Sequence, residues 1–214
     1  MQYIFGAGAQ GRVALAVWRR MQPNAELAFV DGNSDLVGTR IHEVPILETA
    51  AILSLPKKPV VHVALGHNAM RLYLANRYAQ LFDFQNVVDP SAVITLAACL
   101  GRGVFVGPLA VIHTSAVVED FTIINTAAIV EHDVIVRKGA SVSPGVRMAG
   151  RVEIGEGSFI GTGATLLSRV KIGEATVIGA GSVVVHDIPS GVVAYGNPAK
   201  VIRKVTDDDW GKLF

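Results

Sequence analysis

One six-residue repeat runs through the chain from Val88 to Pro189 without an insertion. Each of the seventeen hexads starts with a large aliphatic residue, and the fifth position is nearly always small or β-branched. A period of six fits neither an α-helix nor simple strand alternation, but it suits a short strand followed by a corner. Three such units close a triangular coil of about 18 residues, so the repeat predicts stacked coils with three flat parallel sheets around an aliphatic core. We expect the small fifth residue at the turn.

Composition excludes several classes of protein. The net charge of +1 over 214 residues favours neither nucleic acid nor an anionic membrane as a partner. The longest uncharged stretch, Gly103 to Val118, is too short to span a membrane and is interrupted by Pro108. The N-terminus lacks the features of an export signal, and Cys99 has no partner for a disulfide, so we expect no membrane insertion and a cytoplasmic protein.

The first 86 residues lack the hexad and form a second predicted domain. Apolar runs at Tyr3–Phe5, Leu27–Val30 and Val60–Leu65 are typical of buried strands, and helical spacing covers Arg12–Met21. This strand–helix–strand order predicts a small α/β domain with a Rossmann-like parallel sheet. We therefore divide the chain into an α/β domain (1–86), a β-helix (87–203) and a C-terminal tail (204–214).

A glycine-rich run opens the first predicted helix directly after the first strand. Glycines in this context allow a tight turn and let a phosphate approach the free N–H groups of a helix N-terminus. The domain is too short to bind a dinucleotide such as NAD, so we expect it to bind a single nucleotide, through the diphosphate of a nucleotide-sugar. The alternative is that the glycines only shape the turn. The candidate substrate-binding residues are Gly6, Gly8, Gln10, Gly11, Asp31, Gly32, Asn33, Gly66 and Asn68.

The hexads also place chemistry-bearing residues above one another. Residues 18 apart share a corner on successive coils, which puts His132 next to Gly150. A histidine beside a carboxylate, here Asp133, suits a general base near neutral pH, while a glycine leaves space and an N–H for a thioester carbonyl. An exposed surface histidine is the alternative. No histidine or cysteine spacing indicates a metal site.

Together these motifs carry a family resemblance over residues 3–203. The glycine run, Asp31-Gly32-Asn33, Asn125 with Glu131-His132-Asp133, and Tyr195–Lys200 resemble the bacterial nucleotide-amino-sugar N-acetyltransferases of the bacillosamine pathway. These belong with the sialic-acid O-acetyltransferases among the hexapeptide-repeat acyltransferases. The resemblance implies a left-handed parallel β-helix, a homotrimer, and acetyl-CoA in a groove between adjacent subunits. Asp31-Gly32-Asn33 departs from the acidic pair of that family, which leaves the preferred nucleotide open.

The resemblance also implies roles for single residues. His132 is the general base, Asp133 its partner, and Asn125 a contact supplied across the subunit boundary. Gly150 donates its N–H to the thioester, and the residues near CoA are Gly196, Asn197, Pro198, Ala199 and Lys200. The implied activity is transfer of acetyl from acetyl-CoA to the amino group of a nucleotide-linked sugar in bacterial surface glycan synthesis. A sugar O-acetyltransferase and a non-catalytic, nucleotide-binding trimeric scaffold are the alternatives.

Overall fold

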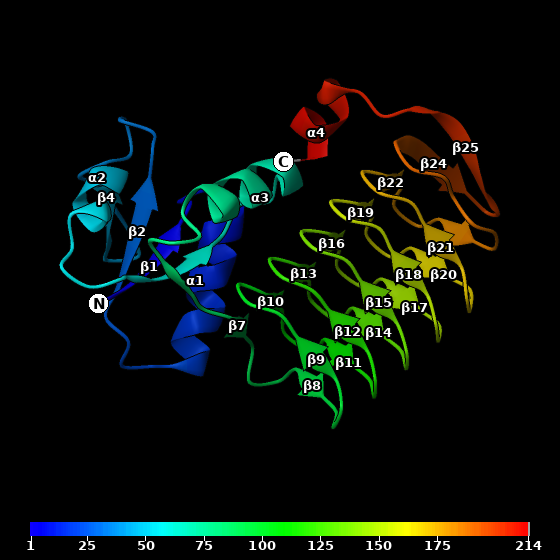
Figure 1. The fold of residues 1–214 in the computed structure, drawn as a ribbon, viewed down its shortest axis with the longest axis horizontal. Helices are drawn as coiled ribbons and strands as arrows, with labels where there is room; N and C mark the ends of the chain where they lie inside the picture. The colour runs from blue at the N-terminus through cyan, green and yellow to red at the C-terminus, as the bar shows by residue number, and fades with distance from the viewer. Residues whose placement is uncertain (214) are drawn as a thin grey trace.

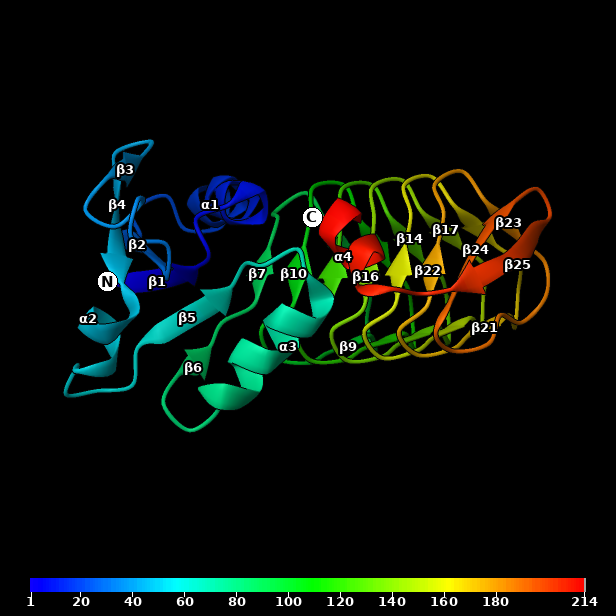
Figure 2. The same ribbon diagram turned by 90° about the horizontal axis from the view of Figure 1, so that it is seen from above.

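The chain folds into an α/β domain followed by a parallel β-helix (Figure 1). This computed structural model describes the backbone of residues 1–213 and the side chains of residues 1–210. A C-terminal hairpin ends the β-helix, and the last helix returns from it toward the α/β domain (Figures 1 and 2).

The α/β domain is built on one six-stranded sheet with the order β3-β4-β2-β1-β5-β6. All its neighbouring strands are parallel except the β3–β4 hairpin. The predicted strands and first helix are present, whereas β3, β4 and β6 were not predicted. In chain order the elements are β1 (Gln2–Phe5), α1 (Ala9–Met21), β2 (Leu27–Asp31), β3 (Arg40–Ile41), β4 (Val44–Glu48), α2 (Thr49–Leu53), β5 (Val60–Val63), α3 (Asn68–Arg77) and β6 (Asp83–Phe84).

Three sheets form the sides of the β-helix, and each coil visits them in the same order. The domain-facing sheet contains β7 (Val87–Val88), β10 (Phe105–Val106), β13 (Ile123–Ile124), β16 (Ser141–Val142), β19 (Phe159–Ile160), β22 (Val177–Ile178), β24 (Val192–Gly196) and β25 (Ala199–Lys204). The middle sheet contains β8 (Val93–Ile94), β11 (Val111–Ile112), β14 (Ile129–Val130), β17 (Arg147–Met148), β20 (Thr165–Leu166) and β23 (Val183–Val184). The charged sheet contains β9 (Cys99–Leu100), β12 (Val117–Val118), β15 (Ile135–Val136), β18 (Glu153–Ile154) and β21 (Lys171–Ile172).

The hexad explains both the core and the corners. Residues 18 apart pair in register, as Val106 does with Ile124, and the aliphatic first positions pack inside the coils. The expected turn position needs correction, because the fourth residue of every hexad from Ala97 to Gly181 is the left-handed one, with φ of +47° to +69°. The fifth residue follows that corner and is buried, so it is small because it points into the narrow interior.

The two domains share a hydrophobic cluster. Outward-facing Phe105 and Ile123 of the domain-facing sheet pack with Trp18 and Phe29 of the α/β domain. His62 lies between the rings of Trp18 and Phe105, and burial lowers its pKa to about 4, which keeps it neutral at neutral pH. The α/β domain is therefore packed against one side of the β-helix.

Candidate active site

The candidate base lies at the corner between the middle and charged sheets. His132 and Asp133 follow β14, and Asp133 occupies the left-handed position with φ +59°, a conformation that aspartate tolerates better than most residues. His132 Nδ1 and Asp133 Oδ2 are 2.9 Å apart, and Arg151 Nε lies 3.5 Å from the same oxygen. Both side chains of the pair are about half exposed (48% and 45%), so the corner is open to a ligand.

This contact determines which ring nitrogen is available. The hydrogen bond with His132 lowers the pKa of Asp133, and the nearby Arg151 acts in the same direction. Because an ionised carboxylate only accepts hydrogen bonds, we assign the proton of the neutral imidazole to Nδ1. Nε2 then has a free lone pair, which is the state a general base requires.

Gly150 lies one coil beyond the histidine, as the spacing of 18 predicted. A Cβ on this glycine would overlap the imidazole at Nε2 and Cε1, so any other residue would force the ring of His132 out of this orientation. The Gly150 carbonyl accepts from the N–H of Arg169, which lies on the next coil, at 3.1 Å. The Nε2 edge of the imidazole therefore lies next to the Gly150 backbone, while the side chain is still about half exposed.

A separate pocket of about 600 Å³ lies between the α/β domain and the domain-facing sheet. We call it the acceptor pocket. It is lined by Gly8, Ala9, Gln10, Ala64, Leu65, Gly66, His67, Met70, Ile123, Asn125, Ser141, Val142, Ser143, Pro144, Phe159 and Thr162. The structure thus brings four predicted site residues, Gly8, Gln10, Gly66 and Asn125, to one cavity. The Nε2 of Gln10 is buried and has no hydrogen-bond partner, so it can donate to a ligand there.

The glycines of the first turn have different roles. A Cβ on Gly11 would overlap the carbonyl oxygen of Gly6, and Gly6 itself has φ +109° and packs against Ala64. These two glycines are needed for the close packing of helix and strand. Gly8 has ordinary backbone geometry, with φ −74°, and a Cβ there would meet no atom within 4 Å. Of the three, only Gly8 lines the pocket.

The end of β2 supports the glycine turn through Asp31. Asp31 Oδ2 accepts from the Ala7 N–H at 2.8 Å, and Oδ1 accepts from the Asn33 N–H at 2.9 Å. Asn33 in turn accepts from the N–H of Asp35, and Gly32 and Asn33 are exposed. None of Asp31, Gly32 and Asn33 is among the residues that line the acceptor pocket.

Some predicted residues are placed elsewhere, and some pocket residues were not predicted. Asn68 is 1% exposed and donates to the carbonyls of Gly157 and Ser158, so it lies behind the pocket wall. Ser141 and Ser143 were missed. Ser141 is a polar residue in the outward-facing row of the domain-facing sheet that is otherwise apolar from Phe105 to Val177, and that interruption was the available signal.

The predicted CoA-contacting residues form the hairpin that ends the β-helix. Gly196 and Ala199 pair across this turn between β24 and β25, and the Asn197–Pro198 peptide bond is cis. The chain then returns to the α/β domain, where α4 (Asp207–Leu213) lies close to α3 in both views (Figures 1 and 2). The ring centroids of Trp210 and His67 are 6.2 Å apart. The tail therefore reaches the rim of the acceptor pocket.

Within one chain, the candidate base and the acceptor pocket are on different corners. Asn125 follows β13 of the domain-facing sheet, whereas His132 follows β14, one side of the triangle further along. His132 is not among the pocket-lining residues. The middle sheet between them carries exposed apolar residues at Val93 and at the neighbouring corner residues Leu96 and Leu109.

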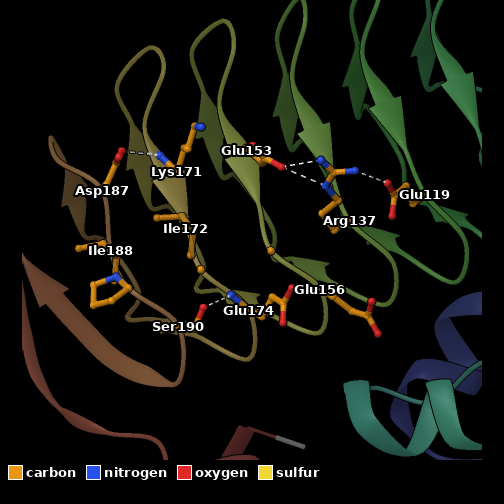
Figure 3. A pocket seen from close by; sticks show the side chains of 13 residues that line it. Glu119, Arg137, Glu153, Glu156, Lys171, Ile172, Glu174, Asp187, Ile188 and Ser190 are labelled. Atoms are coloured by element: carbon orange, nitrogen blue, oxygen red, sulfur yellow. Dashed lines mark hydrogen bonds and ion pairs between the residues drawn. The ribbon is translucent and has the colours of Figure 1, made fainter.

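The charged sheet has its own hollow, which Figure 3 shows with its lining side chains. Arg137 lies between Glu119 and Glu153 at 2.8 and 2.6 Å, and these bonds raise the pKa of Arg137. Arg137 thus links carboxylates of neighbouring coils. In the part of the chain that the structure describes, no cluster of histidine, cysteine and acidic residues fits a metal ion, and no helix has the length and apolarity needed to cross a membrane.

Comparison with known proteins gives matches over both domains. The family model described as "PglD N-terminal domain" matches residues 3–78, and the model described as "Bacterial transferase hexapeptide (six repeats)" matches residues 151–186. A search of curated proteins gives no match.

Three solved structures align over almost the whole chain. PerB from Caulobacter crescentus, in complex with CoA and GDP-perosamine, is 33% identical, covers 94% of this chain and 96% of its own, and has a TM-score of 0.87. A histidine-to-asparagine variant of perosamine N-acetyltransferase from the same organism, with the same ligands, is 33% identical with coverages of 94% and 95% and a TM-score of 0.87. The acetyltransferase domain of PglB from Neisseria gonorrhoeae, in complex with acetyl coenzyme A, is 32% identical with coverages of 94% and 98% and a TM-score of 0.88.

Proposed function

The chain belongs to the bacterial sugar N-acetyltransferases with a left-handed β-helix, and from this membership we propose that it acetylates the amino group of a nucleotide-linked amino sugar. It uses acetyl-CoA as the acetyl donor. The single observation that carries the choice of acceptor is the pocket between the domains, which opens at the N-terminus of α1 and ends on the polar residues Asn125 and Ser141 of the β-helix. A nucleotide held by the α/β domain would direct its sugar toward the β-helix.

The proposed reaction is a direct transfer. The amine nitrogen attacks the thioester carbonyl carbon, a C–N bond forms, the C–S bond breaks, and CoA leaves as a thiolate that takes up the proton His132 removed from the amine. His132 Nε2 takes the proton that the amine loses, while Asp133 holds Nδ1–H and favours the imidazolium that forms. In this scheme the N–H of Gly150 stabilises the oxyanion, and the hairpin from Gly196 to Lys200 contacts CoA.

The active site is proposed to be shared between neighbouring subunits of a homotrimer. In a single chain the base at one corner does not reach the pocket at the next corner. A three-fold arrangement that buries the exposed apolar residues of the middle sheet brings His132 of one subunit to the acceptor pocket of another. Asn125 then meets the transferred acetyl group across this boundary.

Replacing the base tests the mechanism. We expect His132→Ala to lower turnover by roughly 10²–10⁴-fold, the usual contribution of a positioned base, with little change in the KM for acetyl-CoA. Asp133→Asn should cost less, because it weakens the orientation of the base without removing it. His113→Ala is the matched control, since His113 is an exposed histidine on the preceding coil.

The assay also separates the alternatives. Thiol release from acetyl-CoA is measured with a panel of nucleotide amino sugars and with sugars that carry only hydroxyl groups. Turnover with the hydroxyl sugars alone would assign the chain to O-acetylation, and no thiol release with any acceptor would favour the scaffold. A loss of less than about tenfold in His132→Ala would show that His132 is not the main base.

A further inference from the structure

A buried arginine lies directly behind the wall of the acceptor pocket. Arg71, on α3, is 1% exposed. On the α/β side its guanidinium donates to the carbonyl oxygens of Leu65 at 2.6 Å and Gly66 at 3.0 Å, both in the pocket wall. On the β-helix side it donates to the carbonyl oxygens of Phe121 and Gly139, both at 2.8 Å. One side chain therefore joins the two domains at the pocket.

The partners of this arginine leave its positive charge unbalanced. Its remaining acceptors are Asn68 Oδ1 at 2.9 Å, Ser141 Oγ at 3.2 Å and the carbonyl oxygen of Ala140 at 3.5 Å, and all of them are neutral. Among the described residues no carboxylate forms an ion pair with Arg71. Burial lowers the pKa of Arg71 to about 9, so the group is still a cation at neutral pH. Hydrogen bonds to neutral oxygens stabilise a buried guanidinium but do not cancel its charge.

The surroundings do not supply the missing negative charge either. None of the residues that line the acceptor pocket is aspartate or glutamate. Asp31, near the glycine turn, already accepts two backbone N–H groups. The neighbouring His62 is held neutral, its pKa being lowered mainly by burial and further by the charge of Arg71. The N-terminus of α1, at Gly8 to Gln10, adds a positive dipole on the opposite wall.

We propose that Arg71 is a positioning residue whose unbalanced charge, acting through the wall formed by Leu65, Gly66 and Ser141, selects the diphosphate of the acceptor. This inference rests on the proposed function, because it concerns how the same pocket recognises a nucleotide-linked sugar. In a poorly hydrated interior, a charge acts over a longer range than in water, so a diphosphate in the pocket is attracted without touching the guanidinium. The diphosphate becomes the counter-ion that the protein itself lacks.

Two pairs of variants separate the charge of Arg71 from its packing. Arg71→Met removes the charge and keeps a long stem, whereas Arg71→Lys keeps the charge. Asn68→Asp places a carboxylate against the guanidinium, behind the wall and outside the pocket lining. Asn68→Ala is its control, because both changes remove the amide donors to Gly157 and Ser158 but only one adds a charge.

Calorimetry at pH 7 measures the affinity of each folded variant for uridine and UDP and for guanosine and GDP. The quantity compared is the gain in affinity from nucleoside to nucleoside diphosphate, for whichever base the natural chain binds. We expect this gain to fall about tenfold or more in Arg71→Met and Asn68→Asp, and to be largely retained in Arg71→Lys and Asn68→Ala. If Arg71→Met does not fold, the two Asn68 variants still give the answer.

Other outcomes overturn the proposal. An unchanged gain in Arg71→Met or Asn68→Asp would show that the charge of Arg71 does not reach the ligand. Equal losses for the nucleoside and the diphosphate would show that Arg71 only maintains the pocket. Failure of the natural chain to bind any of the four probes is a different result, since it contradicts the nucleotide acceptor itself and the charge selection with it.

Discussion

At the scale of single residues, the proposed chemistry depends on the space that two glycines leave by having no side chain. Gly150 leaves space for the imidazole of His132, and Gly8 leaves the pocket open beside the N-terminus of α1. Gly6 and Gly11 serve the packing of the strand–helix turn instead. A glycine-rich motif therefore mixes positions that affect ligand binding with positions that affect folding.

Substitution separates these two kinds of glycine. We expect Gly8→Val to weaken the binding of the nucleotide-sugar and to spare both the melting temperature and acetyl-CoA binding, because the added side chain meets only the pocket. Gly11→Ala should instead destabilise the fold by about 1–3 kcal/mol through overpacking. Calorimetry with each ligand and thermal unfolding distinguish the variants. Normal nucleotide-sugar affinity in Gly8→Val would place the acceptor elsewhere.

The sequence predicted the corner at His132 better than it predicted the acceptor pocket. The pairing of His132 with Gly150 follows from a spacing of 18, because one period orders every coil. The acceptor pocket joins α1 and α3 to strands more than fifty residues away, and no local period relates these segments. This is why Ser141 and Ser143 were missed and why the buried position of Asn68 was not foreseen.

At the scale of elements, the repeat predicts the coils but not the shorter pieces around them. β4 contains Pro45 and pairs with the two-residue strand β3, so neither has a clear periodic signal. The short helix α4 in the C-terminal tail was not predicted either. The start of α4 is attached to β25 through one acidic residue. Asp209 accepts from both terminal nitrogens of Arg203, in β25, and from the Thr206 N–H.

The attachment of α4 to β25 can be weakened without changing His132 or Asp133. The hydrogen bonds from Arg203, and then those from Thr206, lower the pKa of Asp209. Since the folded pKa is depressed, the attachment is fully present above about pH 4, the usual pKa of a free aspartate, and is lost as the pH falls through the folded value. We expect Asp209→Asn to weaken it at neutral pH.

Hydrogen exchange of residues 205–210 measures the effect. Exchange should become faster in Asp209→Asn and stay unchanged in the control Asp208→Asn, because Asp208 is exposed. We also expect a higher KM for the nucleotide-sugar, since Trp210 packs against His67 at the rim of the acceptor pocket. Faster exchange with an unchanged KM would mean that the tail does not contribute to the pocket.

At the scale of the whole molecule, the two halves of the proposed site belong to different corners of one β-helix. The α/β domain is packed onto the domain-facing sheet through a shared hydrophobic cluster, so it cannot swing its pocket to His132 of the same chain without breaking that core. The shared site therefore requires a neighbouring subunit. Light scattering that shows a monomer at micromolar concentration would contradict this arrangement.

Mixed oligomers test the shared site most directly. In this account His132→Ala and Gly8→Val each have low activity alone when the nucleotide-sugar is kept below saturation, because one lacks the base and the other binds the acceptor weakly. Co-expressed in equal amounts, with different tags for purifying the mixed species, they should regain activity. A cyclic trimer that contains both kinds of subunit has one of its three sites with both functional halves, whichever kind is in the majority, so we predict about a third of the natural turnover. Mixed trimers with no more activity than the parent variants would show that base and acceptor pocket act within one chain.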